Sequence, residues 1–365
     1  MKYKIVSSFD KNSMCKLDFE PTLAIAFYVS SSKSIFLESY NYISDFFPKL
    51  DVFAVSSESN IFHTLPYIDS KKHNEIFVFL DIDKKYYSIS KINMNKNSSH
   101  NPFESANAIF FSLSHIYVES KIQNIESKLG DGGQVYGMMA ATSKSEDVPS
   151  LFYNGEFLDD TGIICYIDSS KYGMNGVAIH NFEPIGLRLE ITKAQTNTIY
   201  ELENRLALDV IEEIIGKIEQ DEIDSFSHPL FLMGKNENVD EYSLLSSIDK
   251  IDRESRSITL CREVTTHYSA VKLAIPIGIE DERLKLNKLK ENSLDRGLLF
   301  LFACIGVKRF YGQHEHMKLM LLSKKLKNKF VGCHTYGEIA PSINKTFSEL
   351  QNHTFTFVSI FEKDT

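Results

Sequence analysis

Two stretches of the chain, one near each end, share the order of a buried strand, an amphipathic helix and a second buried strand. In the first stretch, residues 23–29 and 51–55 are unbroken apolar runs, which are typical of strands covered on both faces. The segment between them repeats apolar residues at helical spacing, namely Phe36, Tyr40, Ile43 and Phe47. Two buried strands joined by one helix are most simply parallel neighbours.

The second stretch repeats this design. Residues 298–304 form an apolar run, residues 312–327 are expected to form a helix, and residues 330–333 are the returning strand. The two stretches look like degenerate copies, although a chance recurrence of a common unit would give the same spacing. We therefore expect an α+β fold with two related halves, each containing a βαβ unit, with mixed, partly parallel sheets and flanking helices.

Local signals between these stretches predict further elements. Asn154-Gly155 lies between Phe152 and Phe157 and favours a hairpin. Residues 200–217 are expected to form a helix that ends at Gly216. Its expected apolar face consists of Leu202, Leu206, Val210 and Ile214. We place the domain boundary after this helix, which gives domains at 20–217 and 218–362.

Charge and cysteine usage limit the function classes. A net charge of −9 with acidic and basic residues intermixed argues against nucleic acid or an anionic membrane as a partner. The sequence shows no secretory leader pattern and no apolar run of membrane-spanning length. The five cysteines are scattered without a C-x-x-C pair, which favours reduced thiols. Together these features predict a cytoplasmic protein.

The turn after the last strand of the second stretch is the strongest candidate for a binding site. Ligands of open α/β sheets usually bind at the carboxyl ends of parallel strands. Thr335, Tyr336 and Glu338 would supply a hydroxyl, an aromatic wall and a charge there. Gly337 would let the backbone approach a ligand closely or adopt a positive φ. The alternative is that Tyr336 and Glu338 only fix the turn through hydrogen bonds.

Other candidate residues point less clearly to chemistry. Haem ligation could use His180, His334, Cys304 or Cys333, although histidines near strands are more often structural and no C-x-x-C-H signature is present. Adjacent residues on a helix face different directions, so His314-Glu315-His316 is a poor metal site and is taken as a solvated helix start. The motifs G-x-S-x-G, H-E-x-x-H and G-x-G-x-x-G are absent, and we expect no enzyme.

The C-terminal part of the chain resembles the FIST family. Residues 332–341 (GCHTYGEIAP) are similar to its Gly-x-x-Thr-Tyr-Gly-Glu-Ile signature, and residues 352–356 resemble its closing Asn-x-Thr strand. Cys304-Ile305-Gly306, followed by Gly312 and Glu315, resembles the preceding strand and helix. The N-terminal part matches more loosely. Its first unit ends in residues 54–60 (AVSSESN), where the family has a Gly-Cys-Ser-Thr-x-Gly-Glu-like turn, so the resemblance leaves a binding role for this turn open.

The resemblance implies a sensory protein that binds a small ligand such as an amino acid and signals to a partner such as a histidine kinase or a cyclase. It implies ligand binding by Thr335, Tyr336, Gly337, Glu338, Glu315 and Cys304. Some members of the family are haem proteins that sense nitric oxide, which would use His180 or His334 here. Three hypotheses therefore stand: a metal-free small-molecule sensor, a haem-based nitric-oxide sensor acting on a histidine kinase, and a ligand-free interaction scaffold.

Overall fold

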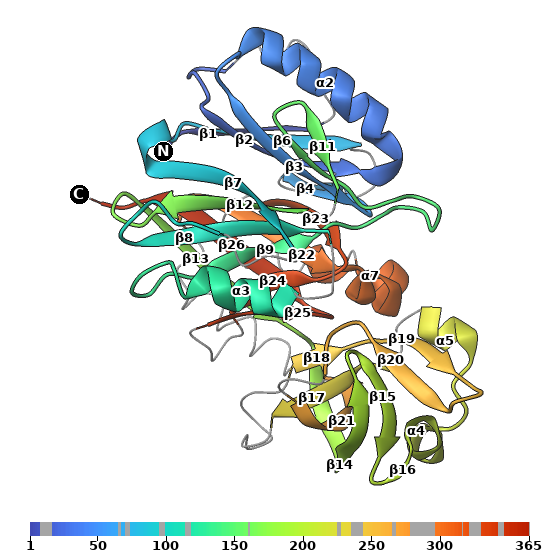
Figure 1. The fold of residues 1–365 in the computed structure, drawn as a ribbon. Helices are drawn as coiled ribbons and strands as arrows, with labels where there is room; N and C mark the ends of the chain where they lie inside the picture. The colour runs from blue at the N-terminus through green and yellow to red at the C-terminus, as the bar shows by residue number, and fades with distance from the viewer. Residues whose placement is uncertain are drawn as a thin grey trace.

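Three six-stranded sheets and one eight-stranded sheet make up the protein in the computed structural model (Figure 1). The structure describes residues 1–364 except 8–16, 65–66, 70–73, 95–98, 114–117, 160, 225–227, 235–243, 265–267, 278–295, 316, 321–329 and 342–346. The three six-stranded sheets together form a body, and the eight-stranded sheet with its helices forms a second region that we call the module. The predicted class, mixed sheets that contain parallel pairs with flanking helices, is confirmed.

Each sheet of the body has one parallel pair at its centre. The first sheet has the order β1 (Tyr3–Ser7), β6 (Glu75–Leu80), β2 (Leu23–Val29), β3 (Asp51–Ser57), β10 (Leu151–Tyr153) and β11 (Glu156–Leu158). The second has the order β25 (Ser348–Gln351), β24 (Glu338–Pro341), β9 (Val135–Met139), β8 (Ala106–Ser112), β12 (Thr161–Asp168) and β7 (Tyr87–Asn93). The third has the order β13 (Tyr172–Ile179), β26 (Phe355–Glu362), β22 (Leu298–Cys304), β23 (Phe330–Thr335), β4 (Asn60–Thr64) and β5 (Tyr67–Asp69).

The body is built from three consecutive copies of one unit. Each copy has an edge strand, a parallel pair joined through a helix, a hairpin, and a return strand that pairs between the edge strand and the first strand of the parallel pair. The helices after the first parallel strands are α2 (Lys33–Phe46), α3 (Val118–Glu126) and α7 (Ile305–Tyr311). The predicted pairs β2·β3 and β22·β23 are confirmed as parallel. The pair β8·β9 with α3 is a third copy that the sequence patterns did not reveal.

The hairpin of each copy belongs to the sheet of another copy. Hairpin β4–β5 follows β3 but pairs with β23 in the third sheet. Hairpin β24–β25 follows β23 but pairs with β9 in the second sheet. Hairpin β10–β11 follows β9 but pairs with β3 in the first sheet. This cyclic exchange joins the three copies, and it places segments from both ends of the chain in one sheet.

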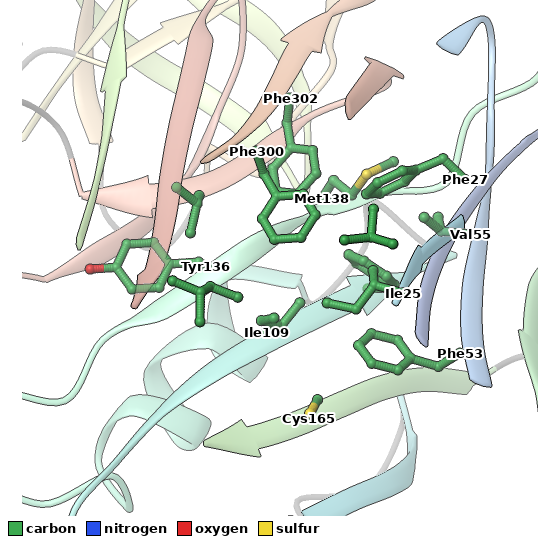
Figure 2. Close-up of a cluster of buried hydrophobic side chains, with 14 of the residues drawn as sticks. Ile25, Phe27, Phe53, Val55, Ile109, Tyr136, Met138, Cys165, Phe300 and Phe302 are labelled. Carbon is green, nitrogen blue, oxygen red and sulfur yellow. The ribbon is translucent and has the colours of Figure 1, made fainter. Parts of the chain in front are cut away.

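Apolar side chains from all three sheets meet in one core (Figure 2). The Phe27 ring lies 6.3 Å from that of Phe111 and 6.0 Å from that of Phe300, centroid to centroid, so each of the three sheets contributes one ring. All three side chains are at most 2% exposed. Replacing a buried phenylalanine by alanine typically costs about 3–5 kcal/mol, so this shared core is a main source of stability.

The module is inserted into the third copy, between β13 and β22. It is antiparallel throughout its pairings, and its strands lie on both sides of residue 217, where we expected a boundary. Its strands are β14 (Phe182–Gln195), β15 (Thr198–Leu202), β16 (Arg205–Leu206), β17 (Leu230–Gly234), β18 (Leu244–Ser246), β19 (Ile248–Asp252), β20 (Ser257–Leu260) and β21 (Tyr268–Pro276). The helices α4 (Ala207–Ile215) and α5 (Gln220–Asp224) belong to it as well, and the 3-10 turns η1 (Ser30–Ser32), η2 (Lys84–Tyr86) and η3 (Gly312–His314) lie in the body.

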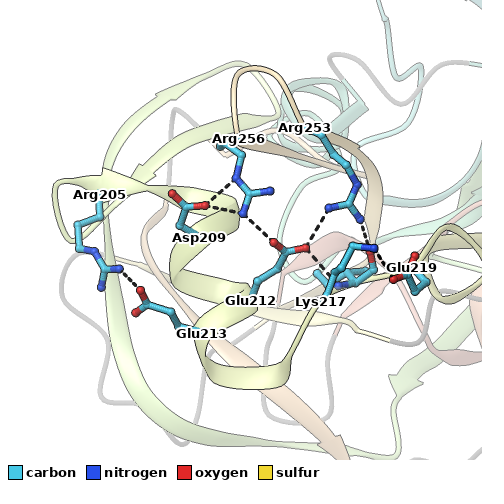
Figure 3. A network of polar contacts seen from close by, with 9 residues as sticks. Arg205, Asp209, Glu212, Glu213, Lys217, Glu219, Arg253 and Arg256 are labelled. Atoms are coloured by element: carbon cyan, nitrogen blue, oxygen red, sulfur yellow. Dashed lines mark hydrogen bonds and ion pairs between the residues drawn. The ribbon is translucent and has the colours of Figure 1, made fainter.

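The prediction of a helix at 200–217 is wrong for its first residues, which form strands, and for the set of side chains that the helix buries. Leu202 lies in β15, which pairs with β14, so sheet pairing overrides the helical spacing there. α4 begins at Ala207 and ends before Gly216 as expected, but it buries Leu208, Val210 and Ile211 while Ile214 is 51% exposed. The outer face of α4 carries an ionic network in which Arg256 contacts Asp209 and Glu212, Arg253 contacts Glu212, and Arg205 contacts Glu213 (Figure 3).

The expected helix at 312–327 begins earlier than its apolar spacing suggested. α7 starts at Ile305, directly after β22, and ends at Tyr311; η3 follows it, and residues 315 and 317–320 are helical as well. Residues 321–327 lie outside the described part of the chain. The Asn154-Gly155 hairpin is confirmed, because β10 and β11 pair Phe152 with Phe157.

Candidate functional site

The carboxyl ends of the three parallel pairs meet through backbone hydrogen bonds. In the bend after β3, the Glu58 amide donates a hydrogen bond to the His334 carbonyl at the end of β23 (3.1 Å), and the His334 amide donates to the Ser59 carbonyl (2.8 Å). In the bend after β9, the Ala141 amide donates to the Ser56 carbonyl near the end of β3 (2.9 Å). The Met139 amide donates to the Gly337 carbonyl, in the bend after β23 (2.8 Å). Each bend is thus fixed against the end of another copy's strand.

A polar group of five residues lies where the first and third copies meet, and we call it the strand-end cluster: Glu58, Ser59, Lys308, Glu315 and His334. His334 Nε2 lies 2.6 Å from Glu315 Oε1, and His334 Nδ1 lies 2.8 Å from Ser59 Oγ. Lys308 forms an ion pair with Glu58 and donates to Ser59 Oγ at 2.8 Å. The cluster therefore joins a bend of the first copy to a strand and a helix of the third.

The cluster has a buried base and a more accessible rim. The His334 side chain is fully buried and that of Glu315 is 8% exposed, whereas those of Glu58 and Lys308 are 20% and 30% exposed. Burial would raise the pKa of Glu58, but the charge of Lys308 and hydrogen bonds from Lys308 and Ser59 outweigh it and lower that pKa. Glu58 is thus ionised at neutral pH, and the rim presents one carboxylate and one ammonium group side by side.

The bend after β23 is closed by its own side chains. Thr335 Oγ1 accepts from the Gly337 amide (3.0 Å) and lies 2.8 Å from the Gly337 carbonyl and 2.9 Å from Glu338 Oε1. Thr354 Oγ1 donates to Glu338 Oε2 at 2.6 Å. An added Cβ at Gly337 would lie 2.9 Å from Leu350 Cδ1, so the protein's own side chain crowds this position; the φ of Gly337 is not positive.

Glu338 and Cys304 are two buried neighbouring groups beneath this bend. Burial raises the pKa of Glu338 well above its ordinary value, and hydrogen bonds from Thr354 and Thr335 offset only part of that effect. Burial, together with the nearby Glu338 carboxyl, raises the pKa of Cys304 as well. Two buried groups whose pKa values are raised in this way favour their uncharged forms, which are poor partners for an ionic ligand.

Tyr336 points to a different partner from its neighbours. Its hydroxyl lies 2.5 Å from Thr142 Oγ1 in the segment that follows β9, and its side chain is half-buried against the core of the second sheet. It links the bends of the second and third copies.

The structure therefore divides the predicted binding residues into groups. Thr335, Gly337, Glu338 and Cys304 lie together as a buried layer, Glu315 lies in the strand-end cluster, and Tyr336 lies between the bends. The partly exposed charges, Glu58 and Lys308, were missed. The rule that ligands bind at carboxyl ends of parallel strands would have found Glu58, because it follows β3 directly.

The histidines proposed for haem are engaged in protein contacts. Both ring nitrogens of His334 are within hydrogen-bond distance of protein oxygens, so His334 does not fit as an axial iron ligand in this arrangement. His180 accepts from the Phe182 amide through Nδ1 at 3.4 Å and packs its ring against Phe231. Among the described residues, no group of three His, Cys, Asp or Glu side chains is arranged to hold a metal ion.

Comparison with known families gives two matches. The FIST N domain model matches residues 22–205, and the FIST C domain model matches residues 207–341. A search of curated proteins finds no match. In the part of the chain that the structure describes, no helix has both the length and the hydropathy needed to span a bilayer.

Proposed function

This chain belongs to the FIST family, whose domains are associated with sensing and signal transduction, and from that premise we propose that its strand-end cluster binds a small zwitterion. The ligand class is that of an amino acid or a similar metabolite. The observation that carries the proposal is the Glu58–Lys308 ion pair, because it offers both charges at a partly exposed rim above a buried, hydrogen-bonded base.

Binding would exchange one ion pair for two. The ligand's carboxylate would contact Lys308 and the Ser59 hydroxyl, and its ammonium group would contact Glu58. A charge pair in a partly desolvated site is worth more than the same pair in water, so such an exchange can be favourable. His334 would stay in place through Glu315 and would orient Ser59.

Signalling follows if the two states of the cluster differ in ligand affinity. In this proposal, occupancy shifts the population of a conformation that a partner such as a histidine kinase or cyclase reads, and no covalent step takes place. The residues of the first and third copies would move relative to each other, because the exchanged ion pair is one of their contacts.

The test is a calorimetric and thermal-shift screen with the natural amino acids, each compared with its decarboxylated amine and its deaminated acid. A zwitterion that binds the native state raises the melting temperature, and analogues lacking one charge should do so much less. Glu58→Gln and Lys308→Met should each weaken binding about tenfold, as expected for loss of a charge contact in a partly desolvated site.

Lys91→Met and Glu156→Gln are the matched controls, since this pair joins β7 to β11 away from the cluster. Equal affinity in wild type and both cluster variants, or no response to any zwitterion, would remove the proposal. The haem hypothesis stays a prediction with its own test, a Soret band in protein purified from haem-replete cells.

A further inference from the structure

The helical segment after β22 contacts both the strand-end cluster and the module. This segment, residues 305–315, comprises α7, η3 and Glu315. On one side, Lys308 reaches Glu58 and Ser59, and Glu315 reaches His334. Figure 1 shows α7 on the side of the body that faces the module.

The other side of the segment packs on the start of the module. The Phe310 ring lies 5.1 Å from that of Phe182, the first residue of β14. Phe182 belongs to a small apolar group with Phe231 and Leu245, all from module strands and all at most 1% exposed. Phe310 packs against this group, so one helical segment carries an ionic contact with the body and an aromatic contact with the module.

His353 adds a second connection at the same place. Its ring lies 5.4 Å from that of Phe182, and its Nε2 lies 2.6 Å from Ser247 Oγ in the module. The segment touches this ring at Gly306, where an added Cβ would lie 3.1 Å from Cε1 and 3.2 Å from Nε2 of His353. Burial lowers the pKa of His353 to about 3, so the ring stays neutral at physiological pH.

We propose that residues 305–315 couple the occupancy of the strand-end cluster to the position of the module, which makes the module the responding part of the molecule. This inference rests on the proposed function for the identity of the input. The physical reason is that Lys308 and Phe310 are two residues apart on one short helix. When the Lys308–Glu58 contact is lost, the helix can move, and its contacts with the module side change: Phe310 against Phe182, and Gly306 against His353.

Hydrogen exchange of the full-length protein tests the coupling. We would follow peptides that contain residues 182–189 and 244–252 on the module side, and 353–357 on the body side. Addition of the zwitterion found by calorimetry should change their exchange rates by roughly two- to tenfold, the range expected for gain or loss of an aromatic contact. Lys308→Met should produce a change in the same peptides without any ligand.

Phe310→Leu is the uncoupling variant, and Phe310→Ala is the more severe form of it. Either should still bind the ligand, with an affinity that differs from wild type by no more than the coupling itself, severalfold at most, but the module peptides should no longer respond. Phe46→Ala, an exposed aromatic at the end of α2, is the matched control and should leave both readouts unchanged.

The outcomes separate the two proposals. If a zwitterion binds but neither it nor Lys308→Met alters the module peptides, the coupling is overturned and the binding proposal stands. If no zwitterion binds but Lys308→Met alters them, the coupling stands and the binding proposal fails. An unchanged module response to ligand in Phe310→Leu overturns the coupling as well.

Discussion

The bend after β3 and the bend after β23 close through the same contact but differ in charge. In the first, Ser57 Oγ donates to Asn60 Oδ1 at 2.8 Å; in the second, Thr335 Oγ1 donates to Glu338 Oε1 at 2.9 Å. In both, the hydroxyl of the last residue of a strand contacts the residue three positions later, which begins the exchanged hairpin. Asn60 and Glu338 thus hold equivalent positions.

The two bends differ in the pair of residues that lies between the strand-end hydroxyl and this closing residue. The first bend places Glu58 and Ser59 at a partly exposed rim, whereas the second has the half-buried Tyr336 and the buried Gly337 at the corresponding positions. The family-like residues Thr335 and Glu338 close a bend, whereas the accessible carboxylate, Glu58, comes from the bend that departs from the family pattern, and its partner Lys308 comes from α7. A matched motif can therefore mark the scaffold of a site, with one of the accessible charges supplied by another copy.

The largest effect is expected from removing the closing residue of either bend. Glu338→Ala and Asn60→Ala should each lower the free energy of unfolding by roughly 2–4 kcal/mol, because a buried cavity forms and buried hydroxyls lose acceptors. Urea unfolding at neutral pH measures this. If Asn60→Ala has no effect while Glu338→Ala does, the two bends are not equivalent.

Glu338→Gln tests whether the titration of Glu338 makes the stability of the second bend depend on pH, which Asn60 cannot do in the first bend. The pKa of Glu338 is raised in the folded state, so its stabilising effect is complete below its unfolded pKa near 4.5 and declines as pH rises toward the folded value. Wild type should lose up to about 1.4 kcal/mol per pH unit relative to Glu338→Gln across that window. Urea unfolding from pH 5 to pH 9 gives the slope, and parallel curves for the two proteins would contradict the assignment.

The hydroxyls of the two bends should matter to a similar extent. Thr335→Val and Ser57→Ala each remove one buried hydrogen-bonding hydroxyl, and each should cost about 1–2 kcal/mol. Chemical denaturation of both variants beside Ser44→Ala, a partly exposed serine on α2, provides the comparison. A loss confined to Thr335→Val would mean that only the third copy depends on this contact.

The smallest effect is expected at the rim. Glu58→Gln should lower stability by about 1 kcal/mol or less, since the pair with Lys308 is partly exposed, and the loss should shrink at high salt. Melting curves at low and high sodium chloride would show this dependence. A large, salt-independent loss would indicate that Glu58 is a structural residue like Glu338.

Buried strands and tight turns could be predicted from the sequence because their signals are local. The apolar runs at β2, β3 and β22 and the Asn154-Gly155 turn each specify one element. The third parallel pair was missed. The helix that joins its strands, α3, has only nine residues and presents a short apolar stripe.

The exchange of hairpins could not be predicted, because strand pairing depends on contacts between residues far apart in the chain. β4 and β24 pair with strands more than 190 residues away, and nothing in their own sequences specifies those partners. The strand-end cluster has the same origin, since it joins Glu58 to Lys308 and Ser59 to His334. Sequence reasoning pointed to the carboxyl ends of the strands, but the residues it named come from only one side of the candidate site.

The cyclic exchange also sets the order in which the sheets can be completed while the chain is synthesised. All strands of the first sheet are present once residue 158 has been made, whereas the second sheet needs β24 and β25, and the third needs β26. β4 lacks one neighbour until β23 has been made, and β9 lacks one until β24 has been made. An open strand edge of this kind can pair with another chain. Nascent protein should therefore be most prone to aggregation during translation of its second half, and the last strands should end that vulnerability.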